Sequence, residues 1–170
     1  MNRIWLTKIA KEYSMYRNRI ANSVAYLHYR ACPNMTSLII GTPLLASTFL
    51  DNPSLTLTFS RVKTIESVTD NVYFPLKYAS KLVQRFPSLV QIELRVFSFD
   101  ICVAIVDIIL SGLAKLSYLE FHFNRDTLLD DPCSRDYVIQ KRRQTFGFDI
   151  NDENSVTVKN DGQSLLIWLS

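Results

Sequence analysis

The sequence predicts an α/β protein, built as a short solenoid of about four strand–helix units that share a parallel sheet. Two observations support this fold class. A hexapeptide with apolar residues at positions 1, 4 and 6 recurs, and its four copies start 27 residues apart, at positions 35, 62, 89 and 116. The segments between the copies carry apolar residues at helical spacing. The length of 170 residues and the apolar fraction of 48% suit one domain with a substantial core.

Each strand is predicted from its hexapeptide. The clearest copies are Met35–Ile40, Leu89–Leu94 and Leu116–Phe121. Val62–Ser67 matches at positions 1 and 4 only, before the pattern shifts to Val68. The pattern L-x-x-L-x-L at a period of about 20–29 residues is typical of leucine-rich repeats. The Asn or Cys that usually follows the last apolar position is missing, so we predict leucine-rich-repeat-like units of the long, helix-containing kind.

Helices are predicted in the intervals between these strands. Pro75 stands in the first turn of one helix, and Asp100 is expected to cap the next. In the first interval, Thr42–Leu50 predicts a short helix, whereas Leu55–Phe59 alternates like an additional strand. Residues 42–60 are therefore the least defined part of the predicted fold.

One domain, residues 1–170, is expected to hold a helical cap over 1–32, repeat units over 33–124 and a C-terminal cap over 125–170. The N-terminal helix is predicted from an apolar stripe at a spacing of three or four residues. The stripe consists of Trp5, Ile9, Tyr13, Tyr16, Ile20, Val24 and Leu27. The first 30 residues also hold six basic residues and one acid, a bias that suits either a mitochondrial presequence or a basic helix retained on the protein.

The C-terminal cap is predicted to combine a helix with a β-hairpin. Asp131-Pro132 is a good helix start, and the helix is expected to run to about Phe146. Val156–Val158 and Leu165–Trp168 are two short strand patterns, and Asp161-Gly162 between them is a hairpin signal. Such a hairpin would cover a sheet edge that otherwise invites aggregation.

The sequence contains no motif that indicates an enzyme or a cofactor. It has no G-x-S-x-G, no Walker loop and no G-x-G-x-x-G. Cys32, Cys102 and Cys133 form no CxxC pair, and the two histidines add no zinc-ligand spacing. We therefore predict a protein that is not an enzyme and holds neither a metal nor another cofactor. Three reduced thiols suit the cytoplasm or the nucleus.

A row of carboxylates is the sharpest prediction of the repeat register. Position 5 of three successive units is Glu66, Glu93 and Glu120. Neighbouring residues in a parallel, in-register sheet lie about 4.8 Å apart, so these side chains would stack on the face opposite the apolar residues. Like charges at this spacing raise each other's pKa and favour a cation. The row predicts either a site for a basic peptide or local neutralisation by Arg95, His122 and Lys63.

The same strand face is the predicted binding surface for a protein partner. Tyr and Arg are typical anchors of protein interfaces, and repeat proteins of this class bind through extended surfaces. The predicted protein-binding residues are Glu66, Gln91, Glu93, Arg95, Tyr118, Glu120 and His122.

Nucleic acid and membranes are alternative partners that the sequence favours less. Lys141-Arg142-Arg143 is the densest basic run, but charges in the last turns of a helix usually complement its dipole and stay solvated. The net charge of +3 is small, and the apolar stretch Ile101–Leu110 is far shorter than the roughly 20 residues of a membrane span. A basic module using residues 1–30 or 141–143 remains the alternative.

Several segments resemble the leucine-rich repeats of F-box proteins, which are substrate receptors of cullin-type ubiquitin ligases. The segments are Phe86–Leu94, Leu113–Phe121, Asp126–Pro132, Tyr137–Gln144 and Gly162–Ser170. The resemblance covers about residues 33–170 and implies substrate recognition in ubiquitin-dependent degradation. Residues 1–32 do not match an F-box, so a ligase role depends on an F-box in the natural full-length product. Without one, the protein is expected to be a stand-alone scaffold.

Overall fold

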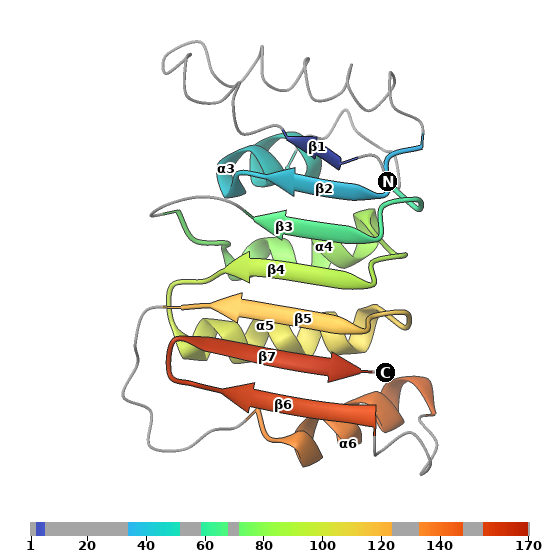
Figure 1. Cartoon of the computed structure of the whole chain (residues 1–170), viewed down its shortest axis with the longest axis vertical. Helices are drawn as coiled ribbons and strands as arrows, with labels where there is room; N and C mark the ends of the chain where they lie inside the picture. The colour runs from blue at the N-terminus through green and yellow to red at the C-terminus, as the bar shows by residue number, and fades with distance from the viewer. Residues whose placement is uncertain are drawn as a thin grey trace.

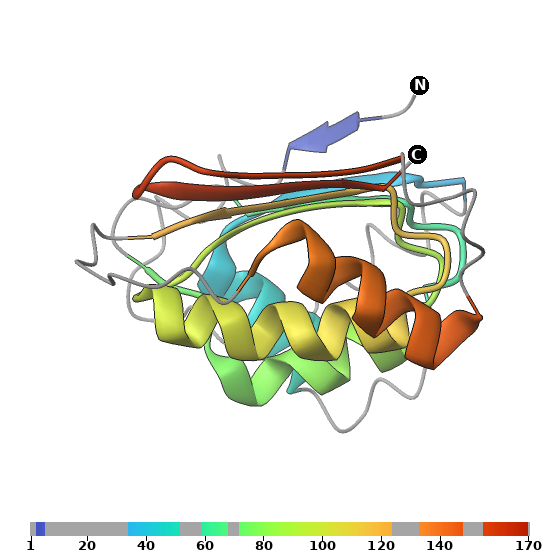
Figure 2. The same cartoon turned by 90° about the horizontal axis from the view of Figure 1, so that it is seen from below.

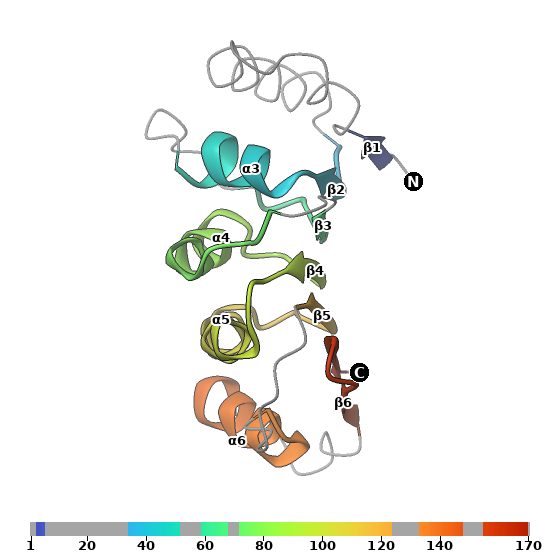
Figure 3. The same ribbon diagram turned by 90° about the vertical axis from the view of Figure 1, so that its left-hand side faces the viewer.

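A computed structural model describes residues 3–5, 34–51, 59–67, 72–123, 133–147 and 155–169. Seven strands form one sheet in the order β1-β2-β3-β4-β5-β7-β6 (Figure 1). Helices α3, α4, α5 and α6 follow one another along one face of this sheet (Figures 2 and 3). The protein is therefore an α/β fold of two layers, and the opposite sheet face carries no helix of the described residues.

Four parallel strands keep the spacing found in the sequence. They are β2 (Ser37–Ile40), β3 (Thr64–Ser67), β4 (Gln91–Arg95) and β5 (Tyr118–His122). Leu38, Ile65, Ile92 and Leu119 are successive Cα partners, each 27 residues from the next, and all are fully buried. Burial of one face fixes the register, since a slip of one residue would turn these side chains to the other face.

The prediction of a short leucine-rich-repeat-like solenoid with a parallel sheet is wrong. The sheet is mixed, because β7 (Ser164–Leu169) runs antiparallel to both β5 and β6 (Val156–Asn160). At the other end, β1 (Arg3–Trp5) pairs with β2, so Trp5 lies in a strand and not in the predicted helix. The rest of the predicted N-terminal helix lies outside the described residues. The hairpin pairs with the edge that β5 would otherwise leave open, which makes the sheet mixed.

The helical segments also differ from one interval to the next, so the strands repeat and the helices do not. They are α3 (Thr42–Leu44), the π-helix η1 (Leu45–Leu50), the 3-10 helix η2 (Leu76–Tyr78), α4 (Ala79–Arg85), α5 (Phe99–Gly112) and α6 (Arg135–Phe146). The predicted helix over Thr42–Leu50 is confirmed. The alternative strand falls on masked positions except for Phe59, which is buried.

Two helix starts differ from the predictions. The hydroxyl of Ser98 accepts a hydrogen bond from the backbone N–H of Ile101, and Asp100 lies in the first turn of α5. The hydroxyl of Ser134 caps α6 in the same way, whereas Asp131 lies outside the described residues. Ser and Asp are comparable N-cap residues, so the sequence alone did not decide between neighbours. The predicted end of α6 at Phe146 is confirmed.

The predicted C-terminal hairpin is confirmed. Gly162 has a φ of 81°, a left-handed conformation that favours glycine in the turn. The carboxylate of Asp161 accepts hydrogen bonds from the backbone N–H groups of Gln163 at 2.9 Å and Ser164 at 2.6 Å. These bonds close the turn and place β7 beside β5.

The basic run Lys141–Arg143 does not form a continuous charged surface. Arg142 is 3% exposed, and its guanidinium donates to the backbone carbonyls of Leu110, Leu113 and Ala114. It thereby caps the C-terminal end of α5. Lys141 pairs with Asp107 at 2.5 Å. The prediction that this run stays solvated is wrong for Arg142, because its position on α6 faces the end of α5.

Candidate functional site

The candidate site lies on the sheet face opposite the helices. Strand side chains alternate between the two faces, so residues two apart on one strand share this face. Glu93 and Arg95 share it on β4, and Tyr118, Glu120 and His122 share it on β5. Their Cα atoms are cross-strand partners, with Glu93 opposite Glu120 and Arg95 opposite His122.

The sheet brings the predicted carboxylates into one row. Glu66 is the Cα partner of Glu93, and Glu93 is the partner of Glu120. All three side chains are half-buried. Burial, reinforced by the charge of Glu120, raises the pKa of the Glu93 carboxyl above its ordinary value, while the hydrogen bond with His122 acts in the opposite direction. The row therefore has the electrostatic character of a cation site.

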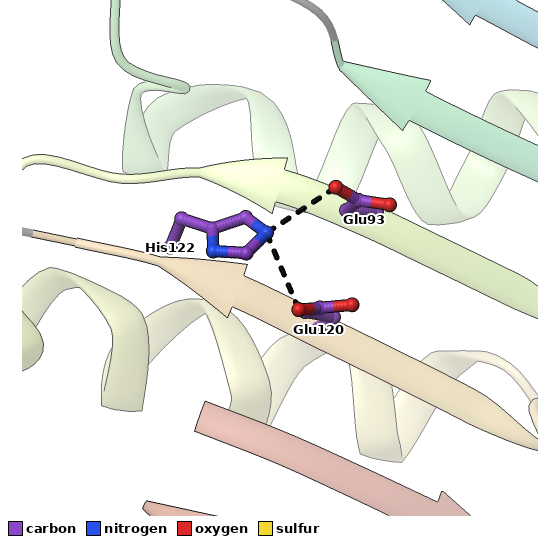
Figure 4. Close-up of side chains that lie close together, drawn as sticks. All are labelled: Glu93, Glu120 and His122. Carbon is purple, nitrogen blue, oxygen red and sulfur yellow. Dashed lines mark hydrogen bonds and ion pairs between the residues drawn. The ribbon is translucent and has the colours of Figure 1, made fainter. Parts of the chain in front are cut away.

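One imidazole bridges two members of this row (Figure 4). The Nε2 atom of His122 lies 3.2 Å from Oε1 of Glu93 and 3.3 Å from Oε1 of Glu120. The exposed fractions of the side chains are 42% for His122, 38% for Glu93 and 17% for Glu120. Glu120 is thus the least accessible of the three, and the group opens to solvent on the side of His122 and Glu93.

The hydroxyl of Tyr118 donates a hydrogen bond to the other carboxylate oxygen of Glu120, Oε2. Burial and the Glu120 carboxylate together raise the pKa of this hydroxyl above its ordinary value, so it stays protonated and continues to donate. Glu120 is therefore held from both sides, with Oε2 toward Tyr118 and Oε1 toward His122.

The predicted local neutralisation of the row is realised by His122 alone of the three residues proposed for it. Over the described ranges, ion pairs to Glu93 and Glu120 come from His122, and none joins Arg95 or Lys63 to the row. Arg95 lies beside His122 as its cross-strand partner. Two carboxylates and one imidazole thus form the centre of the site.

An aromatic depression lies next to the carboxylate row. The rings of Tyr118 and Trp168 are 5.8 Å apart, and Trp168 on β7 is the antiparallel Cα partner of Tyr118. Together with Gln91, Ser117 and Leu169 they line an open hollow of about 480 Å³. Trp168 was not among the predicted site residues, because its pairing with Tyr118 depends on how the hairpin joins the sheet.

The Glu93, Glu120 and His122 group also has the composition of a metal site. One ligand atom from each residue can be chosen so that all three lie within 4.8 Å of one another. The sequence analysis predicted no metal, because the usual zinc spacings place ligands a few residues apart along the chain. Here the sheet register brings Glu93 to within contact of residues 27 and 29 positions later.

Comparisons with known proteins assign no family. No protein-family model and no curated protein matches this sequence. The chain is similar to the solved structure of LepI in complex with SAM, at 12% identity and a TM-score of 0.27 over 98% of this chain and 47% of that chain. It is also similar to a structure described as a pericyclic reaction enzyme, at 12% identity and a TM-score of 0.27 over 88% and 41% of the two chains.

These likenesses are too low to transfer a fold, a ligand or an activity. The chain also spans less than half the length of the solved chains it matches. Since one of them is described as an enzyme, the comparisons give no support to the predicted absence of catalysis. The resemblance to F-box proteins likewise stays a prediction. In the described part of the chain, the helices are all too short or too polar to cross a membrane.

Proposed function

We propose that this protein is an interaction module whose outer sheet face binds an extended basic segment of a partner protein. The observation that supports the proposal is the row of Glu66, Glu93 and Glu120 beside the aromatic hollow of Tyr118 and Trp168. The row attracts Lys or Arg, and the rings provide apolar and cation–π surface.

The dimensions suit a peptide that runs across the strands. Glu66 and Glu120 are separated by two strand spacings, about 9–10 Å, which about three residues of extended chain can span. Basic side chains would lie over the row while a neighbouring side chain enters the hollow beside Gln91 and Ser117. An Arg would stack on an aromatic ring as well as pair with a carboxylate.

The protein already places a cation on one of these rings. The Nζ atom of Lys159 lies 5.5 Å from the centroid of the Trp168 ring. Lys159 is exposed on β6, next to the edge of the proposed surface. A basic side chain of a partner is therefore compatible with the electrostatics of this ring, and it would contact the ring from the hollow or replace Lys159.

Titration with a short peptide that alternates arginine and serine tests the proposal. Glu93→Gln and Glu66→Gln should each weaken binding by up to about fivefold, since exposed ion pairs contribute about 0.2–1 kcal/mol. Trp168→Leu should weaken it further. Asp136→Asn is the matched control, because it removes one negative charge from the exposed first turn of α6 on the other layer. Equal losses for Glu93→Gln and Asp136→Asn would contradict a site on the strand face.

A role in ubiquitin-dependent degradation is the finer form of this proposal. It rests on the resemblance of residues 33–170 to F-box proteins and requires an F-box in the natural full-length product. The intact mass of the endogenous protein separates the two cases. A mass well above 19.6 kDa, the mass of this chain, would favour a ligase receptor, whereas a matching mass would favour a stand-alone scaffold.

A further inference from the structure

We propose that Glu93, Glu120 and His122 form a binding site for a divalent transition metal ion, with Zn²⁺ as the ion that fits best. The inference rests on the geometry and chemistry of these three side chains and is independent of peptide binding by the sheet face.

The ligand atoms have the separations that a tetrahedral ion requires. Zinc binds imidazole nitrogen and carboxylate oxygen at about 2.0–2.2 Å, which implies about 3.4 Å between two ligands at a tetrahedral angle. The Nε2 atom of His122 lies 3.2 Å from the Glu93 oxygen and 3.3 Å from the Glu120 oxygen. Two of the three ligand separations are therefore already present, and the third is at most 4.8 Å.

The donor set selects the class of ion. Imidazole favours zinc and its transition-metal neighbours, whereas Ca²⁺ and Mg²⁺ prefer oxygen ligands throughout. With a neutral imidazole the three side chains carry two negative charges, and Glu66 adds a third one strand away. A divalent cation would balance the two carboxylates that contact it, in place of the proton that His122 now shares with them.

Tyr118 is the positioning residue of this site. Its hydroxyl binds Oε2 of Glu120 and leaves Oε1 directed toward His122. Hydrogen bonds of this kind orient metal ligands, and their loss usually lowers metal affinity by about 10–100-fold. The hydroxyl thus reduces the rearrangement that Glu120 must undergo when the ion binds.

The site keeps one side open. His122 and Glu93 are 42% and 38% exposed, so an ion from solution can reach all three ligands without unfolding the strands. Three protein ligands and an open fourth position is the arrangement of zinc sites that bind a water molecule or an external ligand. Water, or a carboxylate or imidazole of another molecule, would complete the coordination.

Calorimetric titration of the tag-free protein with Zn²⁺ alone tests the proposal, together with the visible absorption of Co²⁺ as a probe of tetrahedral geometry. The background should carry Cys32→Ser, since a thiolate outside the described residues can also bind zinc. We expect one ion per chain. Glu93→Gln and His122→Gln should each weaken Zn²⁺ binding by at least about tenfold, and Tyr118→Phe by about tenfold. Thermal melts establish that each variant is folded.

Glu66→Gln is the matched control, because it removes a carboxylate from the same row without removing a ligand. We expect it to leave Zn²⁺ affinity within about twofold of the parent. Three outcomes would overturn the site: no Zn²⁺ binding, equal losses in Glu66→Gln and Glu93→Gln, or tighter binding of Ca²⁺ than of Zn²⁺. Since Glu66→Gln is expected to weaken peptide binding and spare zinc, failure of either proposal leaves the other separately testable.

Discussion

Replacement of Arg142 by methionine should strongly destabilise the fold. The guanidinium donates at 3.2 Å to the carbonyl of Leu110, at 2.7 Å to Leu113 and at 2.8 Å to Ala114. These carbonyls belong to the last turn of α5 and the residues after it, and helix ends leave such carbonyls without partners in the helix. Methionine keeps the apolar stem of the side chain but donates no hydrogen bond.

The magnitude follows from two opposing effects. Leaving buried carbonyls unpaired costs about 1–3 kcal/mol for each group, so three carbonyls give an upper bound near 9 kcal/mol. Against this, removing the buried charge recovers its desolvation cost, which is also why the pKa of Arg142 lies below its ordinary value. Water can reach the end of α5 when the guanidinium is gone. We therefore expect a net loss of about 3–5 kcal/mol in the free energy of unfolding.

Urea unfolding and thermal melts measure this loss. For a chain of this length, 1 kcal/mol corresponds to about 2–4 °C, so Arg142→Met should lower the Tm by roughly 10 °C. Arg142→Lys should recover only part of the stability, because an ammonium does not span three carbonyls as a planar fork does. Arg143→Met is the control, since the neighbouring side chain is exposed and should change stability by less than about 0.5 kcal/mol. Equal losses for the two methionine variants would refute the capping role.

Three further predictions concern packing, pH and the hairpin turn. Gly112→Ala should destabilise the fold by about 1–3 kcal/mol in urea unfolding, because its Cβ would lie 2.2 Å from Cγ1 of Val83 where α5 meets α4; an unchanged midpoint would contradict this contact. Hydrogen bonding by Lys141 holds the pKa of Asp107 below 3.8, so its contribution is present above that pH and is lost as the pH falls through the folded-state pKa. Asp107→Asn should thus be less stable than the parent at pH 7, with the gap closing in acid; a gap independent of pH would exclude this linkage. Gly162→Ala should cost about 1 kcal/mol through its φ of 81°, and a thermal melt equal to that of the parent would show that the turn tolerates a side chain.

The positions of the central strands could be predicted because burial is written directly into the sequence. Ile65 and Ile92 stand at the same point of the hexapeptide, and a fully buried strand face requires an apolar residue there. The same register then places Glu66 beside Glu93 with no further information. Local alternation and a constant interval are enough for this part of the fold.

The ends of the sheet could not be predicted in the same way. Nothing local to Trp168 states that its strand runs antiparallel to β5, because that pairing is decided by the path of the chain between them. The mixed sheet and the aromatic hollow were missed for this reason. Arg142 was misjudged because a basic side chain faces the core only where a neighbouring helix end offers carbonyls to it.

The candidate site was predicted in part. Glu93, Glu120 and His122 were each expected on the exposed strand face, and the structure places them there in contact. Their suitability as metal ligands was not recognised, because it depends on distances between strands and not on spacing along the chain. Gln91 and Arg95 share the face, but neither contacts the imidazole through a side-chain hydrogen bond or ion pair in the described ranges.

An NMR titration of the ¹⁵N-labelled protein with the arginine–serine peptide tests the central claim most directly. The account predicts shifts in β3, β4, β5 and β7, and in the indole resonance of Trp168, while α4 and α5 stay unchanged. The shifts should diminish with added salt and in Glu93→Gln, and should be absent with a glutamate–serine peptide. Shifts confined to the helical layer, or equal shifts with both peptides, would contradict a basic-segment site on the strand face.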